Sequence, residues 1–309
     1  MKQYKLSLRH ARVAGVAEQE ARALGGLGDA FYVRGRVITA HEHYDQCIEI
    51  GRRIDEAPIL AKYLQMRGVT WFFQNALSNA STDLQASVEA ANKVTNRRAE
   101  MQATHCQGYV LYERGAFVEA VQIFERALDL ARRIETRRYE PVSLLFLAEI
   151  AALAGRWSEA SELAKEALAI CRETGMIFLG PRALAKVALC TGDRKVAETA
   201  LREGKSLLQG KEGICHNYLW FYRDAQEVCL RFREWDSVDR YADALEDYTR
   251  PEPFPWTEFV ISRGRALAEY GRGKRETILM EEIKRLHDEA DRIGLGRALP
   301  RLEEALSVG

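Results

Sequence analysis

One pair of adjacent residues has the types needed for nucleophilic catalysis. His105 stands next to Cys106, and a thiol that an imidazole deprotonates is a strong nucleophile. Neighbouring residues on a helix point in different directions, however, and Cys106 falls on an apolar packing face. We therefore expect no catalytic residues and no enzymatic activity in this chain.

Histidine and cysteine also raise the question of a metal site. His41 and His43 are two residues apart and Cys215 precedes His216, but side chains at i and i+2 diverge on a helix and no further ligands follow at zinc spacing. The six cysteines are scattered without a CxxC pair or a secretory signal, which indicates reduced thiols in a cytosol. The string at 271–277 lacks the spacing of a phosphate-binding loop. We expect neither a metal nor a cofactor.

An aromatic run is the most distinctive candidate site. Residues 218–222 are Tyr-Leu-Trp-Phe-Tyr, followed by Arg223 and Asp224. Aromatic faces beside an arginine can stack on or pair with a ligand. Alternatively, every second residue is core between helical hairpins, and Arg223 and Asp224 make local structural contacts. The sequence leaves both interpretations open.

The composition excludes several classes of partner. Hydrophobic residues make up 47% and charged residues 29%, with only 7 prolines, which is typical of a mostly helical, soluble protein. The 45 basic and 45 acidic residues cancel, so no overall field attracts nucleic acid or anionic lipid. No segment approaches the roughly 20 apolar residues of a membrane span. We expect a cytoplasmic protein that binds neither nucleic acid nor membrane.

Small and apolar residues recur every forty residues. One column is Gly28, Gly68, Gly108 and Ala148; a second is Tyr4, Tyr44, Leu84, Phe124 and Ala164; a third is Leu8, Ile48, Val88, Leu128 and Leu168. Within one unit, residues 108–127 form two amphipathic segments broken by a turn at Gly115, which predicts a helical hairpin. Small residues would let the two helices approach closely, and Phe124 would fill the space between one hairpin and the next.

These columns resemble the TPR pattern, with a small residue on the first helix and a small–aromatic–small series on the second. The matching sets are Gly28, Ala40, Tyr44, Cys47 and Gly108, Ala120, Phe124, Ala127. We therefore predict an all-α fold, a TPR-like α-α superhelix of about seven hairpins with repeats of about 40 residues. Residues 1–309 would form a single domain, with regular repeats over 1–175 and irregular ones over 176–309. Turns at 192–193, 234–235 and 271–273 mark three further hairpins, and a helix over 299–308 would cap the stack.

The first residues match only half of a repeat. Tyr4, Leu8 and Ala11 fit the second helix of a hairpin, with no room for its first helix. The helix is either an N-terminal cap or the start of a C-terminal piece of a longer protein, and we favour the second interpretation.

Four segments point to a narrower family: 21–30, 216–224, 248–256 and 263–268. They resemble the C-terminal TPR region of large bacterial proteins that join a class III adenylate/guanylate cyclase domain to an AAA-type ATPase domain. The resemblance implies a regulatory module that binds a partner or signal and modulates those upstream domains. The catalytic cyclase and ATPase parts are absent from this chain.

By analogy with TPR proteins, the first helix of each hairpin lines a concave groove. The predicted groove residues are Arg22, Asp29, Tyr32, His105, Tyr109, Tyr112, Trp220, Arg223 and Glu227. A mixed polar and aromatic groove suits an extended peptide, a partner protein or the upstream domains of the same polypeptide. The alternative is a small-molecule sensor with its pocket near Trp220 and Arg223.

Overall fold

The computed structural model describes residues 1–209 and 213–307. Over these residues it contains α-helices and two short 3₁₀ helices, η1 (Arg137–Tyr139) and η2 (Gly296–Ala298), and no strand. The helices are α1 (Lys2–Ala14), α2 (Ala17–Tyr32), α3 (Val37–Arg53), α4 (Ala57–Phe73), α5 (Leu77–Lys93), α6 (Arg97–Glu113), α7 (Phe117–Arg133), α8 (Glu140–Leu153), α9 (Trp157–Thr174), α10 (Met176–Leu189), α11 (Arg194–Leu208), α12 (Cys215–Arg231), α13 (Trp235–Thr249), α14 (Pro255–Gly271), α15 (Thr277–Ile293) and α16 (Leu299–Ser307).

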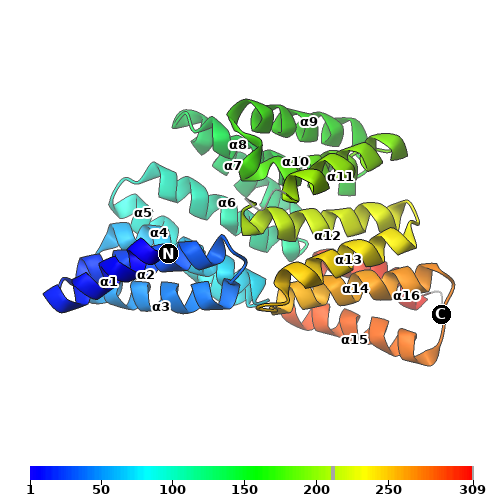
Figure 1. The fold of residues 1–309 in the computed structure, drawn as a ribbon. Helices are drawn as coiled ribbons and strands as arrows, with labels where there is room; N and C mark the ends of the chain where they lie inside the picture. The colour runs from blue at the N-terminus through cyan, green and yellow to red at the C-terminus, as the bar shows by residue number, and fades with distance from the viewer. Residues whose placement is uncertain (210–212, 308–309) are drawn as a thin grey trace.

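Helices α2 to α15 form seven antiparallel hairpins that stack on one another, from α2–α3 to α14–α15 (Figure 1). Helix α1 lies against α2 as a single helix, and α16 packs on α15 at the other end. The all-α superhelix, the seven hairpins and the closing helix are confirmed. None of the helices in the described part of the chain is long and apolar enough to cross a membrane.

A left-handed residue ends each helix of the first half. Positive φ recurs every twenty residues, at Gly15, Gly35, Asp55, Asn75, Thr95, Gly115, Glu135, Gly155 and Gly175. At Asp55 the turn is closed by two backbone bonds, from the Asp55 N–H to the Arg52 carbonyl at 3.3 Å and from the Glu56 N–H to the Gly51 carbonyl at 2.9 Å, the arrangement that caps helix C-termini. Since most helices here have 17 residues, a helix and its three-residue turn take about twenty, and the hairpin takes about forty.

The small-residue column lets a ring lie directly on the neighbouring helix. A Cβ atom on Gly28 or on Gly108 would stand 2.4 Å from the ring of Tyr44 or Phe124, respectively, on the second helix of the same hairpin. Phe124 also stacks on Phe146 of the next hairpin with ring centroids 4.9 Å apart. Phe124 thus fills the space between hairpins, as predicted, and also packs within its own hairpin.

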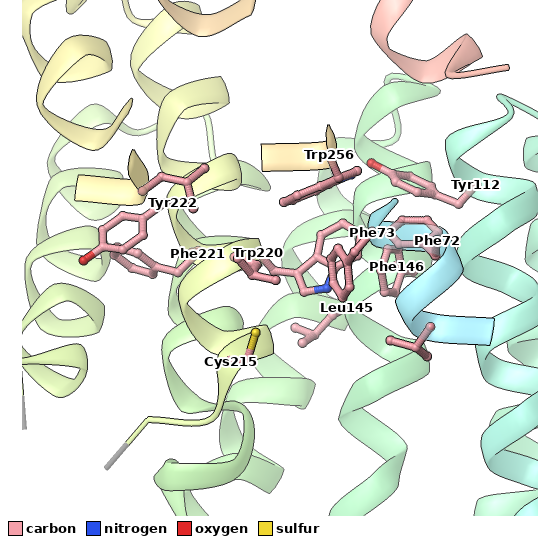
Figure 2. Packing of buried hydrophobic residues seen from close by; sticks show 14 of the residues in the cluster. Phe72, Phe73, Tyr112, Leu145, Phe146, Cys215, Trp220, Phe221, Tyr222 and Trp256 are labelled. Atoms are coloured by element: carbon pink, nitrogen blue, oxygen red, sulfur yellow. The ribbon is translucent and has the colours of Figure 1, made fainter. Parts of the chain in front are cut away.

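The last hairpin folds back against the first hairpins. Trp256 and Phe254, at the start of α14, pack on Phe73 of α4 with ring centroids 5.4 and 5.9 Å away. Trp220 of α12 joins this cluster, 5.4 Å from Trp256 (Figure 2). The proline-containing segment 250–254 connects α13 to α14. Trp256, which follows it, belongs to the core, since only 2% of this residue is exposed.

A carboxylate in the same segment caps a distant helix. Helix α3 has no capping side chain of its own. Instead, Glu252 accepts hydrogen bonds from the backbone N–H groups of Ile38, at 2.8 Å, and Thr39, at 3.3 Å. The superhelix is therefore closed by contacts between its N-terminal and C-terminal hairpins.

Candidate functional site

A cavity of about 300 Å³ opens on the inner face of the superhelix. Its wall takes residues from the first helix of six consecutive hairpins, α2, α4, α6, α8, α10 and α12. Apolar side chains dominate the wall, including Met66, Val69, Phe73, Met101, Val142 and Leu179. The polar groups are few and include Gln65, Gln102, Ser143, His216 and Arg182. An apolar concave site with a few polar groups is the usual form of a binding pocket.

Five of the nine predicted groove residues line this cavity: Asp29, Tyr32, His105, Tyr109 and Trp220. Asp29 accepts hydrogen bonds from the Tyr44 hydroxyl at 3.0 Å and from the Lys62 ammonium at 2.8 Å. These five residues come from α2, α6 and α12, which are the first helices of their hairpins.

His105 is held neutral in the wall. Its Nδ1 lies 3.1 Å from the hydroxyl of Ser143. Burial, and then the positive charge of Arg182, lower the pKa of His105 well below its ordinary value. Next to it, burial raises the pKa of the Cys106 thiol to about 12. A thiol with that pKa is protonated at neutral pH and is a poor nucleophile.

The other four predicted residues do not line the cavity. Arg22 lies on the outer part of α2, where its Nε is 2.8 Å from the Glu18 carboxylate and half of the side chain is exposed. Tyr112 and Arg223 lie one helical turn after the cavity residues Tyr109 and Trp220, but both are buried and bonded to each other. Glu227, one further turn along α12, pairs with Arg263 of α14 and Arg301 of α16. Trp220 and Arg223 therefore do not form one pocket.

Arg223 belongs to a buried ion cluster. It contacts Glu149 at 3.0 Å, Asp224 at 2.7 Å and the hydroxyl of Tyr112 at 3.1 Å. Lys186 pairs with both acids as well. Burial alone would raise the pKa of Glu149, but Arg223 and Lys186 lower it below the ordinary value. The structural interpretation of Arg223 and Asp224, which the sequence left open, is the one that this geometry supports.

Glu227 is likewise paired inside the protein. It accepts a hydrogen bond from Arg263 at 2.6 Å, and Arg301 lies 3.4 Å away. Burial opposes ionisation, but these two arginines lower the pKa of Glu227 to about 2. The space beside it is a second cavity of only about 20 Å³, which has room for about one water molecule.

Arg182 also lines the main cavity, although it was not among the predicted groove residues. One signal was available: Arg182 interrupts an apolar stretch, between Leu179 and the run Ala183, Leu184, Ala185. A charged residue inside an apolar helical stretch indicates a buried charge with a special environment.

A stack of helical hairpins with a cavity lined by their first helices defines a TPR-like module. Residues 55–295 match the family model of the MalT-like TPR region, so the chain belongs to this family. A comparison with curated proteins gave no significant match.

Solved structures with the same fold include regulators from signalling systems. The Rap conjugation gene regulator of plasmid pLS20, in complex with the Phr* peptide, is 15% identical, with a TM-score of 0.66, and the match covers 94% of this chain and 76% of that one. A Rap protein complexed with competence and sporulation factor is 16% identical, with a TM-score of 0.60, over 87% of this chain and 76% of that one. A signal-transduction ATPase with a TPR sensor from Pyrococcus horikoshii is 15% identical, with a TM-score of 0.52, over 93% of this chain and 40% of that one. At these identities the matches show the fold alone.

Proposed function

We propose that this chain is a non-catalytic regulatory module that binds a peptide, or an extended segment of a partner protein, in the cavity on its concave face. The observation that carries the proposal is the origin of the cavity wall in six consecutive hairpins. A ligand in this place contacts all six first helices at once, so its binding favours one curvature of the superhelix over the others.

Two of the structural relatives support a peptide ligand. One Rap structure is a complex with the Phr* peptide, and the other is a complex with competence and sporulation factor. The wall of the cavity here offers what such a ligand needs: apolar pockets for side chains, and the amides of Gln65 and Gln102, which can pair with peptide N–H and C=O groups.

Ligand binding to this module would regulate a coupled signalling domain. The relative from Pyrococcus horikoshii combines a TPR sensor with a signal-transduction ATPase, which supports coupling to an ATPase. Coupling to a cyclase domain rests only on the resemblance of four sequence segments.

A groove-blocking substitution tests the proposal. Gln102→Trp places a bulky ring in the cavity, whereas Gln107→Trp is the matched control on the same helix, since Gln107 contacts Gln85 and does not line the cavity. Peptides are selected from a displayed random library on the purified chain, and their affinities are then measured by calorimetry. We expect Gln102→Trp to weaken binding at least tenfold and Gln107→Trp to leave it within about twofold. Equal binding by both variants would show that the peptides bind elsewhere.

A small-molecule sensor is the second candidate function. The volume of about 300 Å³ lies at the lower end of the range for small-ligand pockets. Thermal stabilisation of the chain by a metabolite or nucleotide library, lost in Gln102→Trp and without any selectable peptide, would favour this function.

A further inference from the structure

The cavity wall contains a buried cation without a counter-ion. Arg182 on α10 is 1% exposed, and its guanidinium lies 5.3 Å from the ring centre of Phe146 and 5.2 Å from that of Trp220. Over the described residues, no carboxylate stands within ion-pairing distance of Arg182, and its Nε and Nη2 have no hydrogen-bond acceptor. The two aromatic faces compensate only part of the cost of burying the charge.

Other buried cations of this protein are paired. Lys186, one helical turn after Arg182, contacts both Glu149 and Asp224, and Arg223 contacts the same two acids. A buried charge is normally balanced in this way because desolvation without a partner is costly. Arg182 is therefore an exception within its own surroundings.

The groups that face Arg182 supply no negative charge. His105 and His216 are neutral near pH 7, because burial and then Arg182 lower the pKa of both. The hydroxyl of Tyr109 lies beside the guanidinium and stays protonated, since burial raises its pKa. Asp29 is the sole carboxylate in the described wall, and it is paired with Lys62. The charge of Arg182 is thus left for the occupant of the cavity.

We infer that the cavity binds a carboxylate carried on an apolar group, with Arg182 as its ion-pair partner. The guanidinium donates to the two carboxylate oxygens, and the apolar body lies against Phe73, Met101 and Trp220. A single buried cation in an apolar wall matches one negative charge and not the double charge of a phosphate. The inference rests on the proposed function in placing the ligand in this groove. The carboxylate is either the C-terminus of a peptide with an apolar last residue or the head of a free organic acid.

Matched acids and amides test the inference by calorimetry on the full chain. The peptide arm uses pooled hexapeptides that end in Leu, Ile, Met or Phe, as free acids and as C-terminal amides. The organic-acid arm uses octanoate and 4-phenylbutyrate against their amides. In whichever arm binds, we expect each amide to bind about ten- to a hundredfold more weakly than its acid, because the amide lacks the hydrogen-bonded negative charge. The wild-type comparison needs no variant.

Substitution then locates the preference. Arg182→Met is expected to bind acid and amide equally. Arg182→Lys is the second variant, used if Arg182→Met folds poorly, and it is expected to keep part of the preference for the acid. Arg156→Met removes an exposed arginine that pairs with Glu159 outside the cavity, and should keep the wild-type ratio within about twofold. The free Arg182→Met protein should melt at a higher temperature than wild type, because an unpaired buried charge has been removed.

Three results would overturn the inference: equal binding of acids and amides to wild type, a preference that survives in Arg182→Met, or no binding by any probe at millimolar concentration. Peptides that bind equally well as acids and amides would leave the proposed groove function standing and remove only the role of Arg182. Binding by organic acids alone would keep the role of Arg182 and refute the peptide function.

Discussion

The contact between Glu252 and the start of α3 gives the sharpest test of the closed superhelix. Glu252 accepts hydrogen bonds from two backbone N–H groups of a helix that has no capping side chain of its own. Loss of a capping acceptor costs about 0.5–2 kcal/mol, and loss of a negative charge at a helix N-terminus costs about 0.3–1 kcal/mol. Glu252→Ala should therefore lower the free energy of unfolding by about 2 kcal/mol. Glu252→Gln keeps an acceptor without the charge and should cost about 1 kcal/mol.

Urea unfolding measures the total loss, and hydrogen exchange locates it. The amides of Ile38 and Thr39 should exchange markedly faster in Glu252→Ala than in wild type, because their acceptor is gone. Glu281→Ala, an exposed change on α15, is the control and should stay within about 0.5 kcal/mol. A loss below about 0.5 kcal/mol for Glu252→Ala, or unchanged exchange at both amides, would refute the closure contact.

Three further substitutions test other features. Thr95 has a φ of 54°, which is unfavourable for a β-branched residue; Thr95→Gly should raise the free energy of unfolding in urea by about 0.5–1 kcal/mol, and a decrease would contradict the left-handed turn. Glu149→Gln leaves the positive charges of Lys186 and Arg223 in excess and should cost about 3–5 kcal/mol by the same measurement; a loss under about 1 kcal/mol would mean that the cluster is not buried. Burial lowers the pKa of His216 from 6.5 to about 4, so the unfolded chain binds the proton more readily and stability falls as pH drops from about 6.5 to 4. His216→Gln should reduce that fall by about 3 kcal/mol in unfolding curves taken across this range, whereas parallel curves for variant and wild type would argue against it.

The sequence predicts the hairpins well because each depends on local information. Gly108 and Phe124 make one close contact between the two helices of a hairpin, and the same pair of positions recurs every forty residues. The turns were harder to predict at Thr95 and Glu135, where the left-handed residue is not a glycine and carries no turn signal. Their conformation is imposed by the two helices on either side.

The site was predicted in part, for a geometrical reason. TPR analogy indicates which helices face the groove, and two of the residues that it selects, Tyr109 and Trp220, line the cavity. It does not say which side of each helix faces the groove. Arg223, three residues after Trp220 on α12, therefore pairs with Glu149 and does not line the cavity. The role of Arg182 depends on the lack of a carboxylate near its guanidinium. The groups that surround it come from several helices far apart in the sequence, so they are known only once the packing of those helices is known.

The closure of the superhelix has a consequence for how the protein folds. A linear array, in which each repeat contacts only its neighbours, can begin folding anywhere and fray from either end. Here residues 214 positions apart in the sequence are hydrogen-bonded, and bringing together the ends of a flexible loop of that length would cost about 5 kcal/mol in entropy. The closing contact should therefore form last, after the intervening hairpins have stacked and brought the two ends close together. Once formed, it ties the terminal hairpins to each other, so that the array unfolds as one cooperative unit.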